Sequence, residues 1–445
     1  MLPAPRTDRP RERALAILHR AERGGFADPQ IDEARRDLDG RDSAFLLELV
    51  YGVLRNRSLL DWTLDRFSER PVARTDAWTR NILRLAVYQM THLDRVPASA
   101  AVNTATELAK RHGNKSGYVN GLLRTVERNK SSLPLPPADS PLSRLSVLYS
   151  HPAWLVRRWL ERFGMQTTDA ALLSNNRPAP LVIRANMLRS SRDTLLSLLE
   201  GQGASVRATR YAPAGIEILS SPGIATLPAF REGRFIVQDE SAQLVALVLA
   251  PQPGERVLDA CAAPGGKATH IAELMGDRGE VVALESDRKR IGRIGENSGR
   301  LGITIIRPRS GDAEKHRDRA YDRVLVDAPC SGLGVLRRHP DGRWTKTEES
   351  IIERANLQAK ILRNCARLVK PGGVLVYATC TTEPEENEGV VGDFLAKHPA
   401  FTLDDPRPGL PAAAAGLIGG DLFFRTFPKE LTMDGFFAAR MVRRT

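Results

Sequence analysis

Two short apolar runs of the chain each end at a cysteine. The placement of these two cysteines limits the reactions that the protein could catalyse more than any other feature of the sequence. The first run is Val-Leu-Val-Asp-Ala-Pro-Cys (324–330) and the second is Val-Leu-Val-Tyr-Ala-Thr-Cys (374–380). Each run is rich in β-branched residues and is followed by turn residues, which predicts a buried parallel strand that ends in a loop. Because ligands of an open α/β sheet bind beyond the carboxyl ends of its strands, Cys330 and Cys380 are expected to face one crevice.

A third predicted strand (256–259) leads into a glycine turn, which predicts a cofactor loop at the same edge of the sheet. The loop residues are Cys261, Ala262, Ala263, Pro264, Gly265, Gly266 and Lys267. Glycines let a ligand approach the backbone closely, and the N-terminus of a following helix offers unpaired N–H groups. The loop matches neither G-x-G-x-x-G nor the P-loop pattern, which favours a nucleoside cofactor without a pyrophosphate, such as S-adenosylmethionine.

Two acidic residues follow the next two predicted strands and complete the expected cofactor site. Glu285 lies 19 positions after Gly266, a spacing that suits an acid binding both hydroxyls of a ribose. Asp312 follows the third strand, where its carboxylate can accept a hydrogen bond from an adenine amino group. The three strand ends together favour a cofactor site over a simple turn.

The two thiols predict nucleophilic catalysis on an electron-poor ring. Either cysteine alone fits a small buried hydrophobic residue, which is the usual state of a free cysteine. Thiolate addition at carbon 6 of a pyrimidine, however, makes carbon 5 able to accept a methyl group, and elimination then restores the ring. Asp327 lies in the same turn and can hydrogen-bond or protonate N3. The basic residues that can lower a thiol pKa here are Lys267, Arg337, Arg338 and His339.

Composition limits the class of protein. The 445 residues predict two or three domains, and 65 Lys+Arg against 53 Asp+Glu give a net charge of +12. Such a charge suits a nucleic-acid partner, although an arginine-rich composition alone leaves that point open. The four cysteines form no C-x-x-C pair and the histidines are scattered, so neither a structural zinc site nor a disulfide is expected. Cys365 falls on the apolar side of a helical pattern and is expected in the core.

Targeting signals are not evident in the sequence. No run approaches the roughly 20 apolar residues that span a bilayer, so no membrane partner is expected. Residues 1–13 are polar and rich in proline and arginine, without the apolar core of a signal peptide. A cytoplasmic protein is the resulting expectation.

Periodicity divides the chain into four segments. Residues 1–130 are expected to be all-helical, 131–144 a Pro/Ser-rich linker, 145–235 a small α+β subdomain and 236–445 a regular series of βαβ units. Within the first segment, helices are expected over 44–54 and 59–67, with Asp42 or Ser43 as a cap.

Six motifs resemble the bacterial RNA cytosine-5 methyltransferases, in particular those acting on 16S rRNA. They are Asp-Ala-Pro-Cys-Ser-Gly-Leu-Gly (327–334), Ala-Thr-Cys-Thr-Thr-Glu-Pro-Glu-Glu-Asn (378–387), Cys-Ala-Ala-Pro-Gly-Gly-Lys (261–267), Arg-Arg-His-Pro-Asp (337–341), Val-Gln-Asp-Glu-Ser-Ala-Gln (237–243) and Asp-Gly-Phe-Phe (434–437). The N-terminal segment resembles the antitermination factor NusB through Leu-Val-Tyr-Gly-Val-Leu-Arg (49–55) and Tyr-Val-Asn-Gly-Leu-Leu-Arg (118–124). Together these resemblances cover nearly the whole chain.

The resemblance implies a fold and a set of roles. The fold is an all-α NusB-like domain, a small α+β RNA-binding subdomain and a Rossmann-like class I methyltransferase domain. Cys380 would be the nucleophile, Cys330 would assist product release, and Lys267 and Asp327 would complete the catalytic group. Residues 261–267, with Glu285, Asp312 and Asp327, would contact S-adenosylmethionine. The partner would be RNA, in the first place unassembled 16S rRNA, bound by a monomer that needs no metal.

The sequence departs from the family pattern at two places, and it leaves two alternative functions open. Glu285 stands where the family more often has Asp, and Thr381-Thr382 follow the nucleophile where Ser-Val or a similar pair is usual. The same chemistry could act on tRNA instead, although the NusB-like segment counts against this. A non-catalytic RNA-binding or antitermination factor is the second alternative, and the intact set of Cys330, Cys380, Asp327 and Lys267 counts against it.

Overall fold

Two compact units make up the chain in the computed structural model, which describes residues 8–138, 140–427 and 433–445. The helical unit comprises Met1–Pro178 and Leu336–Lys346, and the sheet unit comprises Ala179–Val335 and Thr347–Thr445. Part of the polar N-terminal stretch (1–7) and position 139 of the expected linker lie outside the described residues.

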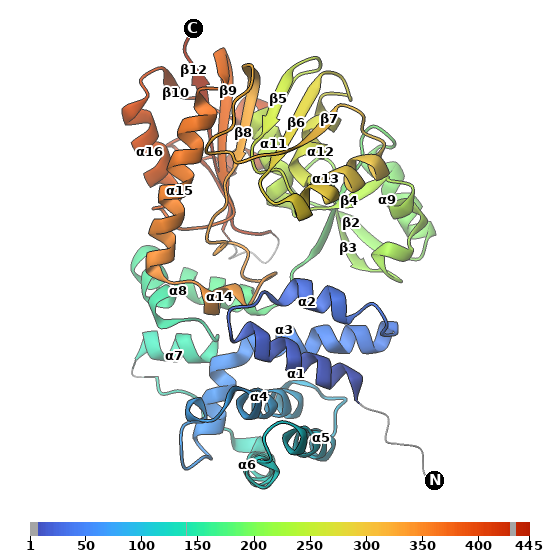
Figure 1. The fold of residues 1–445 in the computed structure, drawn as a ribbon, viewed down its shortest axis with the longest axis vertical. Helices are drawn as coiled ribbons and strands as arrows, with labels where there is room; N and C mark the ends of the chain where they lie inside the picture. Colours follow the sequence, from blue (N-terminus) through green and yellow to red (C-terminus); the bar gives the residue numbers. More distant parts are fainter. Residues whose placement is uncertain (1–7, 139, 428–432) are drawn as a thin grey trace. The chain divides into compact units, whose positions relative to one another are not determined.

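The helical unit is built from helices (Figure 1), and those within residues 9–128 surround an apolar core that includes Leu15, Leu46 and Val87. Its helices are α1 (Arg9–Ala21), α2 (Ala27–Ala34), α3 (Gly40–Asp65), α4 (Ala77–His92), α5 (Ala98–Arg111), α6 (Ser116–Arg128), α7 (Pro141–Leu148), α8 (Ala153–Asn176) and α14 (Gly342–Thr345), with short 3₁₀ turns η1 (Val72–Arg74) and η2 (Lys130–Ser132). The expectation of an all-helical N-terminal domain is confirmed.

Helix α3 differs from the expectation in its start and its length. The carboxylate of Asp39 accepts the N–H of Asp42 at 2.8 Å and begins the helix, so the predicted cap at Asp42 or Ser43 is wrong. The two helices expected over 44–54 and 59–67 are one continuous helix. The residues between them, 55–58, include neither proline nor glycine, and a run of ordinary helix formers continues the i to i−4 hydrogen bonds.

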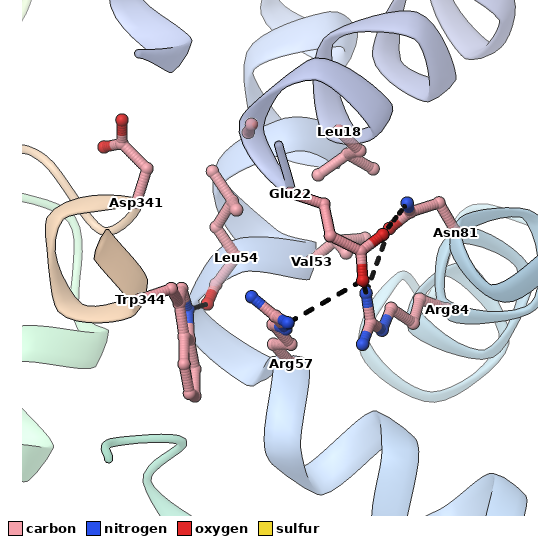
Figure 2. Close-up of a pocket in the computed structure, with 10 residues that line it drawn as sticks. Leu18, Glu22, Val53, Leu54, Arg57, Asn81, Arg84, Asp341 and Trp344 are labelled. Carbon is pink, nitrogen blue, oxygen red and sulfur yellow. Dashed lines mark hydrogen bonds and ion pairs between the residues drawn. The ribbon is translucent and has the colours of Figure 1, made fainter. Parts of the chain in front are cut away.

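The segment Leu336–Lys346 returns from the sheet unit and packs within the helical unit. The indole of Trp344 donates to the Leu54 carbonyl at 3.1 Å, and the Asp341 carboxylate accepts the N–H of Ala27 at 3.0 Å. Figure 2 shows Trp344 near a cluster in which Glu22 meets Arg57 and Arg84. The cavity at this cluster measures only about 10 Å³, which leaves room for about one water and excludes it as a substrate site.

A four-stranded antiparallel sheet begins the sheet unit, with strand order β2-β3-β1-β4. Its elements are β1 (Leu181–Ala185), α9 (Arg192–Gly201), β2 (Ser205–Ala208), β3 (Gly215–Ser220), η3 (Ile224–Thr226), α10 (Pro228–Arg231) and β4 (Phe235–Val237). Leu195 and Leu199 of α9 pack with Ile183 and Phe235 to form its core. This subdomain has the expected small α+β fold, but the predicted start at residue 145 is wrong, because residues 145–178 cluster with the helical unit. The predicted linker 131–144 is also too long, because α7 begins at Pro141.

An eight-stranded mixed sheet forms the remainder, in the order β10-β12-β9-β8-β5-β6-β7 with β11 paired to β12. Its strands are β5 (Arg256–Asp259), β6 (Glu280–Glu285), β7 (Ile306–Ser310), β8 (Tyr321–Asp327), β9 (Val369–Thr379), β10 (Phe401–Leu403), β11 (Phe424–Arg425) and β12 (Phe437–Arg443). Strands β9, β8, β5, β6 and β7 are parallel. The central residues of β9, β8, β5 and β6 are apolar and buried on both faces, whereas the edge strand β7 is exposed after Ile306.

Helices cover both faces of this sheet (Figure 1). They are α11 (Glu240–Leu249), α12 (Gly266–Leu274), α13 (Arg288–Leu301), α15 (Glu348–Ala366) and α16 (Glu388–Lys397), and two short 3₁₀ helices, η4 (Arg407–Gly409) and η5 (Ala412–Leu417), follow. Val257 packs with α11 to α13, whereas its neighbour Leu258 packs with α15 and α16, as strand alternation requires. Cys365 is fully buried on α15, which confirms its expected place in the core. None of the described helices is both long and apolar enough to cross a membrane.

A buried ion pair joins the four-stranded subdomain to the large sheet. Arg184 of β1 is fully buried and donates to the two carboxylate oxygens of Glu273 in α12 at 2.8 and 3.1 Å. It also donates to the carbonyl of Gly266 in the predicted cofactor loop at 2.8 Å. The subdomain is thereby tied to the loop whose chemistry is considered next.

Replacing Arg184 with leucine should destabilise the sheet unit by about 3–5 kcal/mol, because Glu273 would remain buried without its cation. The matched control is Arg207→Leu, which removes an exposed pair with Glu217 in the same subdomain and should cost no more than about 1 kcal/mol. Denaturant unfolding of the three proteins measures both values. If both variants lost the same small amount of unfolding free energy, the result would contradict a structural role for the buried pair.

Candidate active site

A cavity of about 520 Å³ lies at the carboxyl ends of the parallel strands, within the sheet unit. Eight of the predicted site residues line it: Cys261, Ala263, Lys267, Glu285, Asp312, Asp327, Cys330 and Cys380. The remaining four, Ala262, Pro264, Gly265 and Gly266, lie in the same loop between β5 and α12 but do not line the cavity. The parallel register therefore assembles the strand ends that the sequence singled out.

The loop between β5 and α12 is shaped by one obligatory glycine. Gly265 has a φ of 101°, which side-chain-bearing residues rarely adopt, and its N–H donates to the Ala262 carbonyl at 2.7 Å. The tight turn places Lys267 in the first turn of α12, where its side chain lines the cavity. A β-carbon at Gly265 would also press on the backbone of Ile294 at 3.3 Å.

Glu285 ends β6 with its carboxylate held by neighbouring backbone groups. It accepts the N–H of Asp287 at 3.0 Å and the N–H of Ala263 at 3.3 Å, and Arg290 lies 3.8 Å away. The side chain is only 5% exposed, yet it lines the cavity. An acid held in this way at the end of the second strand suits a ribose, and its role in binding one stays a prediction. Asp312 lies after β7, where its carboxylate accepts the N–H of Glu314 at 2.9 Å.

Lys267 and Asp327 form an ion pair in the cavity wall. The ammonium nitrogen of Lys267 lies 2.7 Å from the Asp327 carboxylate and 5.1 Å from the centre of the Phe436 ring. Burial opposes the charge on Lys267, but the attraction of Asp327 and, after it, of Cys380 outweighs this and raises the pKa of the amine. Lys267 is therefore a fixed positive charge close to the thiol of Cys380.

The two thiols lie in contact at the end of β8 and β9. Strand pairing places Asp327 opposite Ala378, and the turns that follow bring the Sγ atoms of Cys330 and Cys380 to 3.3 Å. The hydrogen bond to Cys380, together with burial, raises the pKa of the Cys330 thiol well above its ordinary value. Either sulfur can be the donor in this contact, and a Cys330 thiol that keeps its proton is able to donate its S–H to Cys380.

The other basic residues that were expected to lower a thiol pKa make hydrogen bonds or ion pairs outside the cavity. Arg337 donates to the Ser174 hydroxyl at 2.7 Å and His339 contacts Asp28, all within the helical unit. Lys267 is the one of the four candidates that lines the cavity. Sequence reasoning also missed Phe436 and Arg290, which line the cavity. The Asp-Gly-Phe-Phe motif was the signal for Phe436, although its place depends on β12 pairing with β9.

Asp259 ends β5 beneath the ion pair and is fully buried. Burial, reinforced by the charges of Asp327 and Glu285 and opposed by Lys267, raises the pKa of its carboxyl to about 7. The ordinary value is 3.8, so the unfolded chain loses this proton near pH 4 and the folded chain loses it only near pH 7. The contribution of Asp259 to stability is therefore complete at low pH and falls as the pH rises from about 4 to about 7.

Asp259→Asn should remove this pH-dependent loss because the amide does not ionise. Relative to the parent protein, the variant should gain stability between pH 5 and pH 8, by at most about 4 kcal/mol from a shift of about three pKa units. Thermal unfolding of both proteins at the two pH values measures the change. A difference between variant and parent that stays constant with pH would contradict the raised pKa.

Comparison with known proteins agrees with this geometry. A family model described as "16S rRNA methyltransferase RsmB/F" matches residues 246–442, the NusB family matches 8–128, and a ferredoxin-like domain of RsmF/B-like methyltransferases matches 151–224. A probable ribosomal RNA small subunit methyltransferase B from Bacillus subtilis (strain 168) is 38% identical, with 92% of each chain covered.

Two solved structures are similar in fold. The crystal structure of PH0851 superposes with a TM-score of 0.81 at 30% identity, covering 96% of this chain and 98% of the other. NSun6 from Pyrococcus horikoshii, solved with the S-adenosylmethionine analogue SFG, has a TM-score of 0.59 at 24% identity and covers 66% of this chain and 98% of its own.

The cofactor of this family suits the cavity described above. Its volume is in the range of small-molecule sites, and Glu285 and Asp312 supply acceptors where a nucleoside needs them. S-adenosylmethionine is the cofactor, and the residues present fit it. The chain thus belongs to the 16S rRNA methyltransferase RsmB/F family and is an S-adenosylmethionine-dependent rRNA methyltransferase.

Proposed function

We propose that this enzyme methylates carbon 5 of a cytidine in 16S rRNA through a covalent bond between Cys380 and carbon 6. The observation that supports this most strongly is the thiol pair, with its Sγ atoms 3.3 Å apart in the wall of the cofactor cavity. Methylation of a base nitrogen or a ribose oxygen needs no thiol nucleophile. Two adjacent thiols suit a reaction that must first activate a ring carbon and then release it.

Attack by Cys380 begins the proposed reaction. The Lys267 ammonium, whose charge is secured by Asp327, stabilises a thiolate on Cys380, and Cys330 donates its S–H to the same sulfur. The thiolate bonds to carbon 6, and the displaced electron pair moves through the ring toward N3. Asp327 lies in the turn that can hydrogen-bond N3, and Lys267, which donates to Asp327, can supply a proton to the ring.

Carbon 5 of the ring is then nucleophilic enough to accept a methyl group, which S-adenosylmethionine supplies as an electrophile. The loop of residues 261–267, with Glu285, Asp312 and Asp327, would hold the cofactor at the end of the strands. Elimination follows: a water molecule takes the proton from carbon 5, and the electron pair of that C–H bond restores the ring double bond. The bond between Sγ and carbon 6 breaks with its electron pair returning to Cys380, and N3 gives back its proton. Cys330 assists this release, because its retained S–H stabilises the Cys380 thiolate as it departs.

The substrate has to expose its base to this cavity. A cytosine in a helix cannot present carbon 6 to Cys380 without leaving the stack, which favours a loop or 16S rRNA that is not yet assembled. The NusB-like helices and the four-stranded subdomain would bind the surrounding RNA. The enzyme would act as a monomer in the cytoplasm.

Transfer of labelled methyl groups tests the function directly. The purified enzyme, labelled S-adenosylmethionine and either unmodified 16S rRNA or bulk tRNA are incubated in parallel, and the product nucleosides are analysed. We expect labelled 5-methylcytidine in the rRNA alone. Label in tRNA would move the activity to the alternative substrate. A labelled nucleoside other than 5-methylcytidine would contradict the chemistry, and cofactor binding without transfer to free or assembling rRNA would favour a binding factor.

Cys380→Ala should abolish methyl transfer, by at least about 10³-fold, because no nucleophile remains to activate carbon 5. Cofactor affinity should stay within about threefold of the parent value, since the cofactor loop is untouched. Initial rates and equilibrium binding of S-adenosylmethionine measure the two effects. Retained turnover would mean that Cys330 makes the attack.

Cys330→Ala should trap a covalent protein–RNA complex, because release stalls after methylation. The complex should resist denaturant on a gel, and label from the cofactor should migrate with it. The double variant Cys330→Ala, Cys380→Ala serves as the control and should form no such complex. Normal product formation by Cys330→Ala without a complex would rule out the release role.

A further inference from the structure

Glu386 is a fully buried carboxylate for which the proposed mechanism has no use. It lies in the Thr-Thr-Glu-Pro-Glu-Glu-Asn motif after the second cysteine and does not line the cavity. Its Oε1 accepts the backbone N–H of Ser331 at 2.8 Å and the amide of Gln358 at 2.9 Å, and its Oε2 contacts the Ser331 hydroxyl. Burial removes the carboxylate of Glu386 from water, which is unfavourable unless hydrogen bonds replace its hydration. The hydrogen bonds that Glu386 makes therefore point to a structural role.

The contacts of Glu386 reach both cysteine turns. Ser331 directly follows Cys330, and its hydroxyl also contacts the hydroxyl of Thr381 at 2.8 Å, the residue that directly follows Cys380. A continuous chain of hydrogen bonds thus runs from the first cysteine turn through Glu386 and Ser331 to the second. The carbonyl of Glu386 is itself fixed by the hydroxyl of Tyr377 in β9 at 2.6 Å.

Two neighbours hold the other sides of the same turns. Gln358 of α15 donates to the carbonyl of Pro329, the residue before Cys330, at 3.1 Å, as well as to Glu386. Asn387 accepts the hydroxyl of Thr379, the residue before Cys380, at 2.5 Å and donates to the Thr381 carbonyl at 3.0 Å. Each cysteine is therefore held on both sides by this group of buried polar side chains.

We propose that Glu386 is a positioning residue that clamps the two cysteine turns together and sets the spacing of the thiols. The inference rests on the roles of Cys380 and Cys330 proposed above. Both sulfurs have to reach one nucleoside in succession, and a displacement of about 1 Å in such a group costs on the order of 10²-fold in rate. The polar clamp supplies a fixed geometry that the two loops alone do not have.

Hydrogen bonding, not charge, is what the clamp requires. In Glu386→Gln the amide oxygen can accept from Ser331 N–H and from Gln358, while the amide nitrogen donates to the Ser331 hydroxyl. That hydroxyl then donates on to Thr381, so every partner stays satisfied. In Glu386→Ala the Ser331 N–H and the Gln358 amide lose their acceptor. A catalytic base, in contrast, would be lost equally in both variants.

A trivalent arsenical measures the thiol pair without requiring turnover. Phenylarsine oxide condenses with two adjacent thiols, forming two As–S bonds and releasing one water, so its dissociation constant reports whether the sulfurs stay paired. We expect Glu386→Ala to weaken this binding about tenfold and to lower kcat by about 10- to 100-fold, with the KM for S-adenosylmethionine unchanged. Glu386→Gln should stay within about threefold of the parent in each measurement. Cys330→Ala shows how the probe behaves with one thiol.

Glu240→Ala is the matched control for loss of a buried carboxylate. Glu240 is also buried and accepts the N–H groups of Tyr211 at 2.5 Å and Ala212 at 2.9 Å, away from either cysteine turn in sequence. The Glu240→Ala variant should have a lower midpoint temperature of thermal unfolding, but its affinity for phenylarsine oxide should not change. If Glu386→Ala does not fold, Ser331→Ala removes the hydroxyl bridge alone and should weaken arsenical binding about threefold.

Several outcomes would overturn the clamp. They are an arsenical affinity that does not respond to Glu386→Ala or Ser331→Ala, a Glu386→Gln variant as defective as Glu386→Ala, or a parent protein that binds no more tightly than Cys330→Ala. The assay is independent of the methylated product. Arsenical binding that depends on Glu386 in an enzyme yielding no 5-methylcytidine would keep the clamp and remove the proposed function, whereas the reverse result would remove the clamp alone.

Discussion

The parallel pairing of β8 with β9 is the constraint on which the active site depends. Their register sets Asp327 opposite Ala378, and from there each strand needs only a short turn to present its cysteine. A shift of one residue in that register would turn Cys380 to the other face of the sheet and separate the thiols. The register is secured by fully buried apolar residues on both faces, with Val326 and Tyr377 on one face and Leu325 and Val376 on the other.

The apolar sheet brings the two cysteine turns together, and polar side chains then fix the geometry of these turns. Lys267 and Asp327 place a fixed charge near Cys380, whereas Glu386 connects the backbone on the far side of the same turns. Buried ionic and polar groups of this kind add little net stability, since their desolvation offsets their attraction. In the proposed mechanism their value lies in fixed geometry and in a positive charge close to the attacking thiol. Arg184 extends the same principle, because it ties the four-stranded subdomain to the carbonyl of Gly266.

The sequence predicted the features that depend on local pattern. Short β-branched runs ending in glycine, serine or threonine located β5, β8 and β9, and strand ends of a parallel sheet meet at one edge whatever surrounds them. That single rule brought Cys330, Cys380 and Glu285 to one cavity. The helical, α+β and Rossmann-like parts followed from their periodicity in the same way.

Features that depend on contacts between distant parts of the chain could not be predicted from local sequence patterns. Phe436 enters the cavity wall because β12 pairs antiparallel with β9, a contact between segments more than fifty residues apart. Arg337 and His339 follow Cys330 closely in sequence, but the chain there joins the helical unit and its side chains find partners in it. Glu386 lies in a motif that the sequence singled out, but its contacts depend on three elements that are distant in sequence, so its role emerges only from the structure.

The identity of the attacking cysteine is the central claim, and an RNA carrying 5-fluorocytidine tests it most directly. Fluorine at carbon 5 cannot leave as a proton does, so elimination stops and the nucleophile stays bonded to carbon 6 in the unaltered enzyme. After digestion, mass spectrometry identifies the cysteine that carries the methylated nucleotide. We predict that it is Cys380, with Cys330 recovered as a free thiol. A nucleotide on Cys330, or the absence of any adduct when label is transferred to unsubstituted RNA, would contradict the account.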